Sequence, residues 1–325
     1  MDPTLARLSE IPNLTVFRDA PLSAYTRFAI GGPADIYAET DNVNSFIQAL
    51  AVARASGRDY MVMGGGTNLI VSDAGFRGIM LRFVARNLRA TGECVSADAG
   101  VVLQDLVDFS IGHGLKGLET LAGIPGSVGA AVYGNAGAYG HSISERVRHV
   151  RFFDGSSERV FDNTACEFHY RESVFKRRKA WIIFSVELLL ERASKEELAI
   201  TAEGIVKVRN EKFPATMKCA GSIFKNLLLA ELPPETAAAV PAAVVREGKV
   251  PAAYFLEQAG AKGASRGDIH VANYHANLIY NGGSGTASDL CALIQELKDR
   301  VRSRFRIELE EEVQYVGFAN ACPVG

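Results

Sequence analysis

The sequence predicts an α+β protein with mixed sheets, built from two or three domains. Its 325 residues exceed one average domain, and 48% hydrophobic with 22% charged residues are enough for more than one buried core. Segments with helical spacing of apolar residues alternate with short segments of β type, and no internal repeat is visible. A domain boundary is expected near Phe213-Pro214, because proline restricts the preceding residue and favours the end of a helix there.

The first third of the chain is expected to contain a helix followed by a glycine loop. Apolar residues recur at three and four residues over 41–57, with Asp41 or Asn42 as the N-cap and Gly57 as the stop. After this helix come, in order, a strand at 60–63, the glycine loop at 64–68 and an extended segment at 69–71.

The rest of the chain alternates between expected strands and helices. Short strands are expected within 79–99, at 147–153, at 181–190 and at 277–280, and helices at 101–112 and at 195–212. A further helix is expected after Thr286, because Thr286 and Asp289 form a capping-box pattern ahead of apolar residues in helical spacing, namely Leu290, Leu293, Ile294, Leu297 and Val301.

Charge and hydropathy exclude several classes of partner. The net charge is −2, with acids and bases interspersed, so bulk electrostatics would not recruit nucleic acid or a membrane surface. The first residues lack a signal-peptide pattern, and no run of 18 uncharged apolar residues occurs. We therefore expect a cytoplasmic protein that acts on a small molecule, with no obligatory protein partner implied.

The cysteines and histidines do not form a metal-binding pattern. Five scattered cysteines without a C-x-x-C pair indicate reduced thiols, and even His270 and His275 have no Cys or acidic partner at ligand spacing. The sequence therefore predicts no metal site. The cysteines are Cys94, Cys166, Cys219, Cys291 and Cys322.

Two glycine-rich segments are candidates for binding a nucleotide. In the first, which consists of Gly64, Gly65, Gly66, Thr67 and Asn68, no side chain blocks the glycine amides, so successive N–H groups can converge on a pyrophosphate. The pattern is neither the Rossmann nor the Walker fingerprint. A tight turn explains an isolated triple glycine equally well.

The second segment increases the weight of the nucleotide interpretation. It contains Gly123, Ile124, Pro125, Gly126 and Ser127, followed by Gly129, Asn135, Gly137 and Gly140. Two such flexible, donor-rich loops within one chain are unusual. The alternative is a β-rich domain that simply has many bends.

Six motifs in order resemble the UDP-N-acetylenolpyruvoylglucosamine reductase (MurB) family over roughly residues 20–317. They are YTRFAIGGPAD at 25–35, MGGGTNLIVSDAGFRG at 63–78, GLETLAGIPGSVGAAVYGNAGAYG at 117–140, CEFHYRESVFK at 166–176, AGSIFKN at 220–226 and LEEEVQYVG at 309–317. Single motifs of this kind are weak, but six in register are specific. The chain resembles the family's second type, because no tyrosine-bearing loop is inserted between the strand at 181–190 and the next helix.

The resemblance implies a fold and a reaction. The fold is the vanillyl-alcohol-oxidase (PCMH) type of FAD-binding fold, in subdomains at 1–85 and 86–212, with a smaller α+β substrate-binding domain at 213–325. The reaction is the NADPH-dependent reduction of UDP-N-acetylglucosamine enolpyruvate to UDP-N-acetylmuramate through FAD, in peptidoglycan precursor synthesis. The implied FAD-binding residues are Gly64 to Asn68, Gly123 to Ser127, Gly129, Asn135 and Ala138.

Three residues match the family's catalytic positions. Hydride transfer to an unsaturated carboxylate creates negative charge, which calls for a cation at the carboxylate and an acid at the α-carbon. The resemblance assigns Arg171 to the carboxylate, Ser222 to the α-carbon and Glu312 to the enolic intermediate. Without it, Arg171 would be a surface cation, Ser222 part of a turn, and Glu312 one of three acids on a solvated face.

Four further residues match substrate-binding positions of the family: Tyr170, Lys212, Asn226 and His275. His275 is equally explained as a satisfied histidine at the start of a strand, and Lys212 as a surface residue of a helix. Leu227 stands where the family usually has proline, which affects the geometry of that loop but removes no reactive group.

Two other functions stay open at this point. A flavoprotein oxidase of the same fold would use O₂ as acceptor, and a non-catalytic module would bind FAD or a nucleotide sugar without turnover. Arg171, Ser222 and Glu312 together favour the reductase.

Overall fold

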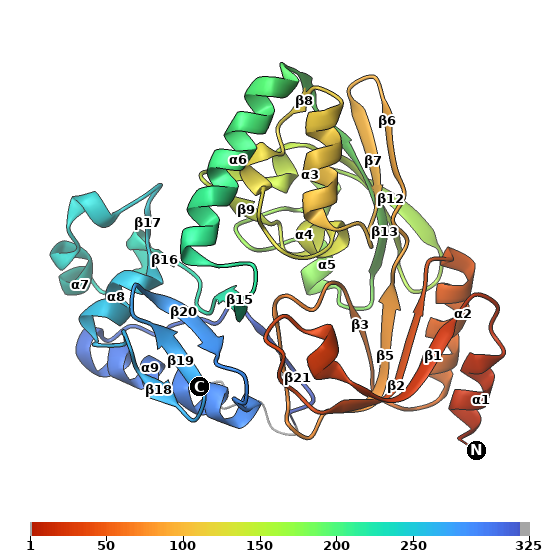
Figure 1. Cartoon of the computed structure of the whole chain (residues 1–325), viewed down its shortest axis with the longest axis horizontal. Helices are drawn as coiled ribbons and strands as arrows, with labels where there is room; N and C mark the ends of the chain where they lie inside the picture. Colours follow the sequence, from red (N-terminus) through yellow and green to blue (C-terminus); the bar gives the residue numbers. More distant parts are fainter. Residues whose placement is uncertain (1, 319–325) are drawn as a thin grey trace. The chain divides into compact units, whose positions relative to one another are not determined.

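A computed structural model describes residues 2–318 of the chain, so Cys322 lies outside the described residues. The chain forms two compact units, drawn in Figure 1. Unit 1 comprises the chain up to Ala20, Asp35–Gly65 and Gly78–Glu211, and unit 2 comprises Pro21–Ala34, Gly66–Arg77 and the chain from Lys212 onward.

The units differ from the expected domains in one respect. The boundary at Glu211/Lys212 coincides with the boundary expected near Phe213-Pro214. Unit 2 also takes in two short segments from the first 80 residues, whereas the expected ranges were contiguous. The division of 1–212 into two FAD-binding subdomains stays a prediction.

One sheet of unit 1 has the strand order β1-β2-β5-β3, and its ends pass into unit 2. Its strands are β1 (Thr15–Pro21), β2 (Pro33–Thr40), β5 (Phe76–Phe83) and β3 (Tyr60–Met63), with β3 and β5 parallel. Helices α1 (Pro3–Ser9) and α2 (Val43–Ala55) accompany this sheet in Figure 1. Phe46 of α2 packs edge-on against Phe83 of β5, so the apolar stripe of the helix is buried in the core.

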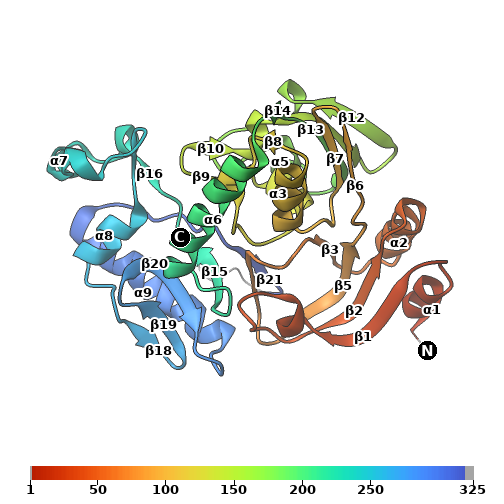
Figure 2. The ribbon, with the colours of Figure 1, turned by 45° about the horizontal axis from the view of Figure 1, so that its top comes forward.

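The second sheet of unit 1 is antiparallel and has the order β12-β11-β13-β7-β6. The strands are β6 (Leu88–Thr91), β7 (Cys94–Asp98), β11 (Val147–Phe153), β12 (Glu158–Asp162) and β13 (Ile182–Leu189). Helices α3 (Leu103–Gly112) and α6 (Lys195–Lys212) run side by side (Figure 1 and Figure 2). The shorter elements are β8 (Leu115–Lys116), α4 (Val128–Tyr133), β9 (Gly137–Ala138), β10 (His141–Ser142), α5 (Val174–Arg177) and β14 (Glu191–Arg192).

Unit 2 contains an antiparallel sheet of order β15-β20-β19-β18. The strands are β15 (Lys218–Ser222), β18 (Ser265–Arg266), β19 (Ile269–Ala272) and β20 (His275–Asn281). Helices α8 (Ala252–Gln258) and α9 (Ala287–Phe305) share one core cluster with Ile269 and Ile279. The remaining elements are β16 (Leu227–Leu228), α7 (Pro234–Ala239) and β17 (Lys249–Val250).

A parallel strand pair joins distant parts of the sequence within unit 2. Strand β4 (Leu69–Val71) follows the first glycine loop, and β21 (Gln314–Val316) is the last strand that the structure describes. The two pair with Gln314 opposite Leu69 and Val316 opposite Val71. The first glycine loop therefore leads directly into a segment that is held by the C-terminal region.

The elements expected from periodicity are confirmed. The helix expected over 41–57 is α2, and Asn42 is its N-cap, accepting from the Ser45 amide at 3.0 Å. The expected capping box also forms, since Thr286 Oγ1 accepts from the Asp289 amide at 3.0 Å and donates to its carboxylate at 2.8 Å. Strands β1 and β2 were not expected, because β1 is mostly exposed and lacks an apolar alternation.

Asp73, just after β4, provides a second cap for α9. Its carboxylate accepts from the Ala287 amide at 2.7 Å, and from the Ser288 amide and hydroxyl at 2.9 and 2.6 Å. Burial raises the pKa of Asp73, but the hydrogen bonds from Ser288 and from the Ala287 amide outweigh this and hold the pKa below its usual value. A loop from the first 80 residues thus satisfies the start of a helix more than 200 residues later.

Replacement of Asp73 by alanine should destabilise unit 2 by about 1 kcal/mol, the usual contribution of a helix N-cap. Because the folded pKa is depressed, the difference from wild type should be complete above about pH 4 and should shrink as the pH falls through the folded pKa of Asp73. Urea unfolding combined with hydrogen exchange of the α9 amides would measure it. Asp41→Ala, at an exposed aspartate ahead of α2, is the control. A difference that grows on acidification would contradict this role of Asp73.

Within residues 2–318, the structure shows no helix with the length and apolar character needed to cross a membrane.

Candidate functional site

In unit 1 the two predicted glycine segments lie against each other. A Cβ on Gly65 would lie 3.1 Å from the Gly126 Cα, and one on Gly64 would lie 3.0 Å from the Ser127 Oγ. Both distances are shorter than ordinary van der Waals contact. Glycine is therefore needed at 64 and 65 so that the backbones of the two segments can approach.

The first glycine segment has amides available for an anion. Residues 2–318 provide no acceptor for the backbone N–H groups of Gly64, Gly65 and Gly66. Buried or half-buried amides of this kind are normally paired, so they fit a ligand that brings oxygen acceptors. The diphosphate of FAD is such a ligand, and the glycine cradle fits it.

The second segment is less donor-rich than its sequence suggested. The Gly123 amide donates to the Gln104 side chain at 2.7 Å, the Ile124 amide to the Leu121 carbonyl at 3.1 Å, and the Gly129 amide to the Ala99 carbonyl at 2.9 Å. These three amides are engaged within the protein. The expectation that they serve as phosphate donors is therefore wrong, and any contact of these residues with the cofactor would use other atoms.

Replacement of Gly65 by valine should weaken FAD binding by roughly 100-fold, about 2.7 kcal/mol, because the side chain would fill the cradle against Gly126. The ratio of flavin to protein absorbance after gel filtration, and titration of the apoprotein with FAD, would measure the loss. Gly204→Ala on α6 is a matched control, since nothing lies within 4 Å of a Cβ there. Equal FAD affinity in the Gly65 and Gly204 variants would contradict the assignment.

The predicted Tyr-Arg-x-Ser motif forms a tight turn in unit 1. His169 and Glu172 form a β-bridge with backbone hydrogen bonds of 3.0 and 3.1 Å, which leaves Tyr170 and Arg171 at the tip. Ser173 caps α5 and donates its hydroxyl to the Tyr133 carbonyl at 2.7 Å. The motif is thereby fixed to the end of α4.

The same motif is bound to the second glycine segment at two further points. Asn135 donates its side-chain amide to the His169 carbonyl at 2.8 Å. The Arg171 guanidinium donates to the Gly137 carbonyl at 3.1 Å, on the strand that also contains Ala138. The structure therefore brings Asn135, Ala138, Tyr170 and Arg171 into one neighbourhood, as the site prediction requires.

Arg171 has a constrained backbone and a supported side chain. Its φ of 57° lies in the left-handed region, which non-glycine residues adopt at a cost. The Lys176 ammonium donates to its carbonyl at 2.8 Å, and its guanidinium lies 5.2 Å from the centre of the Tyr170 ring. Strain of this kind is common where a side chain must be held in a fixed direction.

In unit 2, Ser222 lies at an irregular end of strand β15. The pairing of β15 with β20 is interrupted between Cys219 and Ser222, and Gly221 has a φ of 77°, which favours glycine. A bulge of this kind redirects the following side chain away from the regular pleat. The Gly-Ser pair is therefore a turn, as its sequence alone suggests, and the turn determines the direction of Ser222.

A buried asparagine holds the chain just after Ser222. Asn277, 2% exposed, accepts from the Phe224 amide at 2.9 Å and donates to the Phe224 carbonyl at 2.8 Å, and its own carbonyl accepts from the Ile223 amide at 3.1 Å. Sequence reasoning did not single out Asn277. The available signal was a polar residue between Ala276 and Leu278 in an apolar strand.

Glu312 lies beside this segment, although it is 90 residues away in the sequence. Its amide donates to the Ile223 carbonyl at 2.7 Å, and its carbonyl accepts from the Asn68 side chain at 2.8 Å. The Gln314 amide donates to the Asn68 carbonyl at 3.0 Å. The structure thus brings Ser222, Glu312 and Asn68 together in unit 2, and it gives Asn68 a structural role in addition to the predicted cofactor contact.

Two of the predicted substrate-binding residues also lie together in unit 2. Burial lowers the pKa of His275, and the nearby Lys212 charge lowers it further, so the imidazole is held towards its neutral form. Its Nδ1 is buried, and within the described part of the chain it has no hydrogen-bond partner. Asn226 lies elsewhere, with its side-chain oxygen accepting from the Ala252 amide at 3.4 Å.

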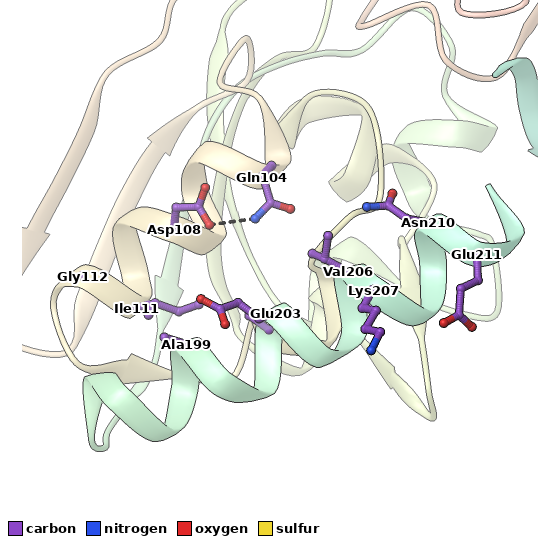
Figure 3. Close-up of a pocket in the computed structure, with 11 residues that line it drawn as sticks. Gln104, Asp108, Ile111, Gly112, Ala199, Glu203, Val206, Lys207, Asn210 and Glu211 are labelled. Atoms are coloured by element: carbon purple, nitrogen blue, oxygen red, sulfur yellow. Dashed lines mark hydrogen bonds between the residues drawn. The ribbon is translucent and has the colours of Figure 1, made fainter. Parts of the chain in front are cut away.

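A hollow of about 890 Å³ in unit 1 contains none of the predicted site residues. It lies between α3 and α6, with Ile111, Ala202 and Val206 among its apolar residues and Asp108 and Glu203 at its polar side, as Figure 3 shows. Its acidic lining does not suit a dinucleotide.

Two family models match the chain. The FAD-binding domain model matches residues 34–161, and the model of the UDP-N-acetylenolpyruvoylglucosamine reductase C-terminal domain matches residues 213–316. The first match includes part of the first glycine segment's surroundings and the whole second segment. Together with the mixed helices and sheets, these matches confirm the predicted fold class.

Similar proteins share the same name. UDP-N-acetylenolpyruvoylglucosamine reductase of Solibacter usitatus is 68% identical over 96% of this chain and 100% of its own length. The protein of that name from Bacillus subtilis is 32% identical over 98% of this chain and 99% of its own length. The crystal structure of MurB from Thermus caldophilus superposes with a TM-score of 0.72 at 28% identity, covering 93% of this chain and 98% of that one.

Full-length similarity at this level, on top of the paired glycine segments and the Ser222–Glu312 neighbourhood, places the chain in the UDP-N-acetylenolpyruvoylglucosamine reductase (MurB) family.

Proposed function

We propose that this chain reduces UDP-N-acetylglucosamine enolpyruvate to UDP-N-acetylmuramate at the expense of NADPH, with Arg171, Ser222 and Glu312 as its catalytic residues. The observation that carries the proposal is the contact between the backbones of Glu312 and Ile223, which brings Glu312 next to Ser222. Two groups that could handle the proton and the charge of this reaction therefore share one site in unit 2.

The cofactor is FAD, which when bound would take a hydride from NADPH and pass it to the enolpyruvyl methylene. The glycine cradle at Gly64 and Gly65 would hold its diphosphate through backbone amides. Asn135 contributes indirectly, because it fixes the turn that bears Tyr170 and Arg171.

Arg171 is assigned to the substrate carboxylate. Addition of a hydride to the methylene carbon leaves negative charge shared between the α-carbon and the carboxylate. A planar guanidinium can bind both carboxylate oxygens and stabilises that charge as it develops. Its strained backbone and its contact with Gly137 preset its direction, so little reorganisation is needed during the reaction.

Ser222 is assigned as the proton donor to the α-carbon. A serine hydroxyl is a weak acid, but the carbanionic carbon that it protonates is strongly basic. Glu312 is assigned to the enolic intermediate, where a protonated or hydrogen-bonded carboxyl would stabilise the oxygen charge. The net reaction consumes NADPH and one proton and releases NADP⁺.

Tyr170, Lys212, Asn226 and His275 are assigned to the substrate. Lys212 and His275 lie close together, and a lysine beside a neutral imidazole suits a phosphate oxygen, which accepts from both. Action on this soluble nucleotide sugar in the cytoplasm, without an obligatory protein partner, is part of the same proposal.

An anaerobic stopped-flow experiment tests the proposal and its two rivals. Flavin absorbance should bleach on addition of NADPH and should return when the enolpyruvyl sugar is added. Return of absorbance with O₂ alone would indicate an oxidase. A flavin that NADPH does not bleach would indicate a binding module.

A further inference from the structure

Lys298 and Glu311 form a buried ion pair directly beside Glu312. The Lys298 ammonium lies 3.1 and 3.2 Å from the two carboxylate oxygens of Glu311, and the two side chains are 5% and 14% exposed. Burial of two charges is costly, and an apolar pair of similar volume is often at least as stable. The pair therefore calls for an explanation other than stability.

The acidic run at 310–312 pairs with the segment that follows Ser222. Phe224 and Glu311 form an antiparallel β-bridge, flanked by hydrogen bonds from the Lys225 amide to the Glu310 carbonyl and from the Glu312 amide to the Ile223 carbonyl. Successive side chains of an extended chain point to opposite faces. Glu311 therefore lies on the Phe224 side, and Glu310 and Glu312 lie on the other.

Glu311 is the charged member of an inward row. Leu309 and Val313, two residues to either side, are 2% and 6% exposed and belong to the core cluster that also contains Leu297 and Val301 of α9. Glu310, by contrast, is exposed and pairs with Lys225. Only one of the three glutamates is thus drawn into the core.

Three identical residues in a row specify their register weakly. A slip by one residue would exchange the faces of the whole run, and the glutamates themselves cannot discriminate between the alternatives. Lys298 comes from a helix whose position is set by its own apolar face, so its charge marks one point in the core. A polar or ionic group that fixes register is the best-attested use of a buried charge.

We propose that Lys298 is a positioning residue for Glu312: its ion pair with Glu311 selects the inward acid and thereby fixes Glu312 on the opposite face, beside Ser222. The inference rests on the proposed function of Glu312. It adds a residue of α9, remote from the reacting atoms, to those that the second half-reaction requires.

The sharpest test compares two isosteric substitutions one residue apart. Glu311→Gln removes the inward charge and leaves Lys298 to attract a neighbouring glutamate, so Glu312 should be displaced. Reoxidation of the reduced flavin by the enolpyruvyl sugar should slow roughly 10- to 100-fold, the effect of a misplacement of about 1 Å. Glu310→Gln, on the exposed face, should leave reoxidation unchanged, and reduction by NADPH should be normal in both variants.

A double substitution separates positioning from a structural role. Lys298→Met alone leaves an uncompensated buried carboxylate and should impair reoxidation, whereas Lys298→Met with Glu311→Met should restore it, because an apolar residue at 311 also faces inward. Arg302→Met, which breaks an exposed ion pair with Glu308 on the same helix, is the control and should have no effect. Should Lys298→Met fail to fold, the Glu311→Gln and double variants still decide.

The outcomes distinguish this inference from the proposed function. If wild-type flavin is bleached by NADPH but not restored by the sugar, the proposed function fails first. If wild type behaves as proposed and Glu311→Gln reoxidises at the wild-type rate, the positioning role of Lys298 is overturned alone. Equal slowing of both half-reactions, or a double variant no better than Lys298→Met, would also overturn it.

Discussion

Replacement of Ser222 by alanine should slow reoxidation of the reduced flavin by the enolpyruvyl sugar by roughly 10²- to 10⁴-fold, the usual contribution of a positioned proton donor. Reduction of FAD by NADPH should stay near the wild-type rate, because that half-reaction needs no acid at the α-carbon. Single-turnover stopped-flow spectra would separate the two rates.

Two controls make the Ser222 result specific. Ser303→Ala, at an exposed serine of α9, should change neither rate. The turn before Ser222 depends on Gly221 and on Asn277, and neither is altered by removal of one hydroxyl. Equal slowing of both half-reactions would contradict the role of Ser222 as the donor.

Replacement of Arg171 by alanine should also affect the second half-reaction, with a loss of roughly 10²- to 10³-fold, the usual effect of removing one preorganised group that stabilises transition-state charge. Loss of the guanidinium removes the charge opposite the substrate carboxylate. The KM for the sugar should rise as well, since the carboxylate is already charged in the ground state. Steady-state kinetics together with single turnovers would measure both effects.

The Arg171 prediction can be separated from an effect of net charge. Arg178→Ala removes one positive charge from an exposed position in the same basic segment and should leave reoxidation unchanged. Arg171→Lys should recover only part of the rate, because an ammonium cannot bind two oxygens in one plane. Reoxidation at the wild-type rate in Arg171→Ala would remove Arg171 from the catalytic residues.

Secondary structure was predictable where periodicity or caps are strong. Helices α2, α3, α6 and α9 and strands β3, β11 and β13 lie where apolar spacing placed them. Strand β1 was not predictable, because only Ala20 within it is buried and its position depends on pairing with β2. Tertiary pairing, and not local preference, makes β1 a strand.

The site was predictable as a set of residues but not as an arrangement. Motifs identified Ser222 and Glu312, but only folding shows that the Glu312 amide bonds to the residue after Ser222. The donor inventory of the second glycine segment was overestimated, since the partners of Gly123 and Gly129 come from Gln104 and Ala99. A sequence gives the number of amides, whereas a fold decides which of them are already used.

The parallel pair of β4 and β21 has a consequence for the order in which the protein is made. Strand β4 leaves the ribosome early, but its partner β21 is about the last strand to be synthesised, so unit 2 cannot close until nearly the whole chain has emerged. Contacts at such a long sequence separation slow folding. While synthesis continues, the apolar residues Leu69, Ile70 and Val71 form an unpaired strand edge, and this period is when the nascent chain is most exposed to aggregation.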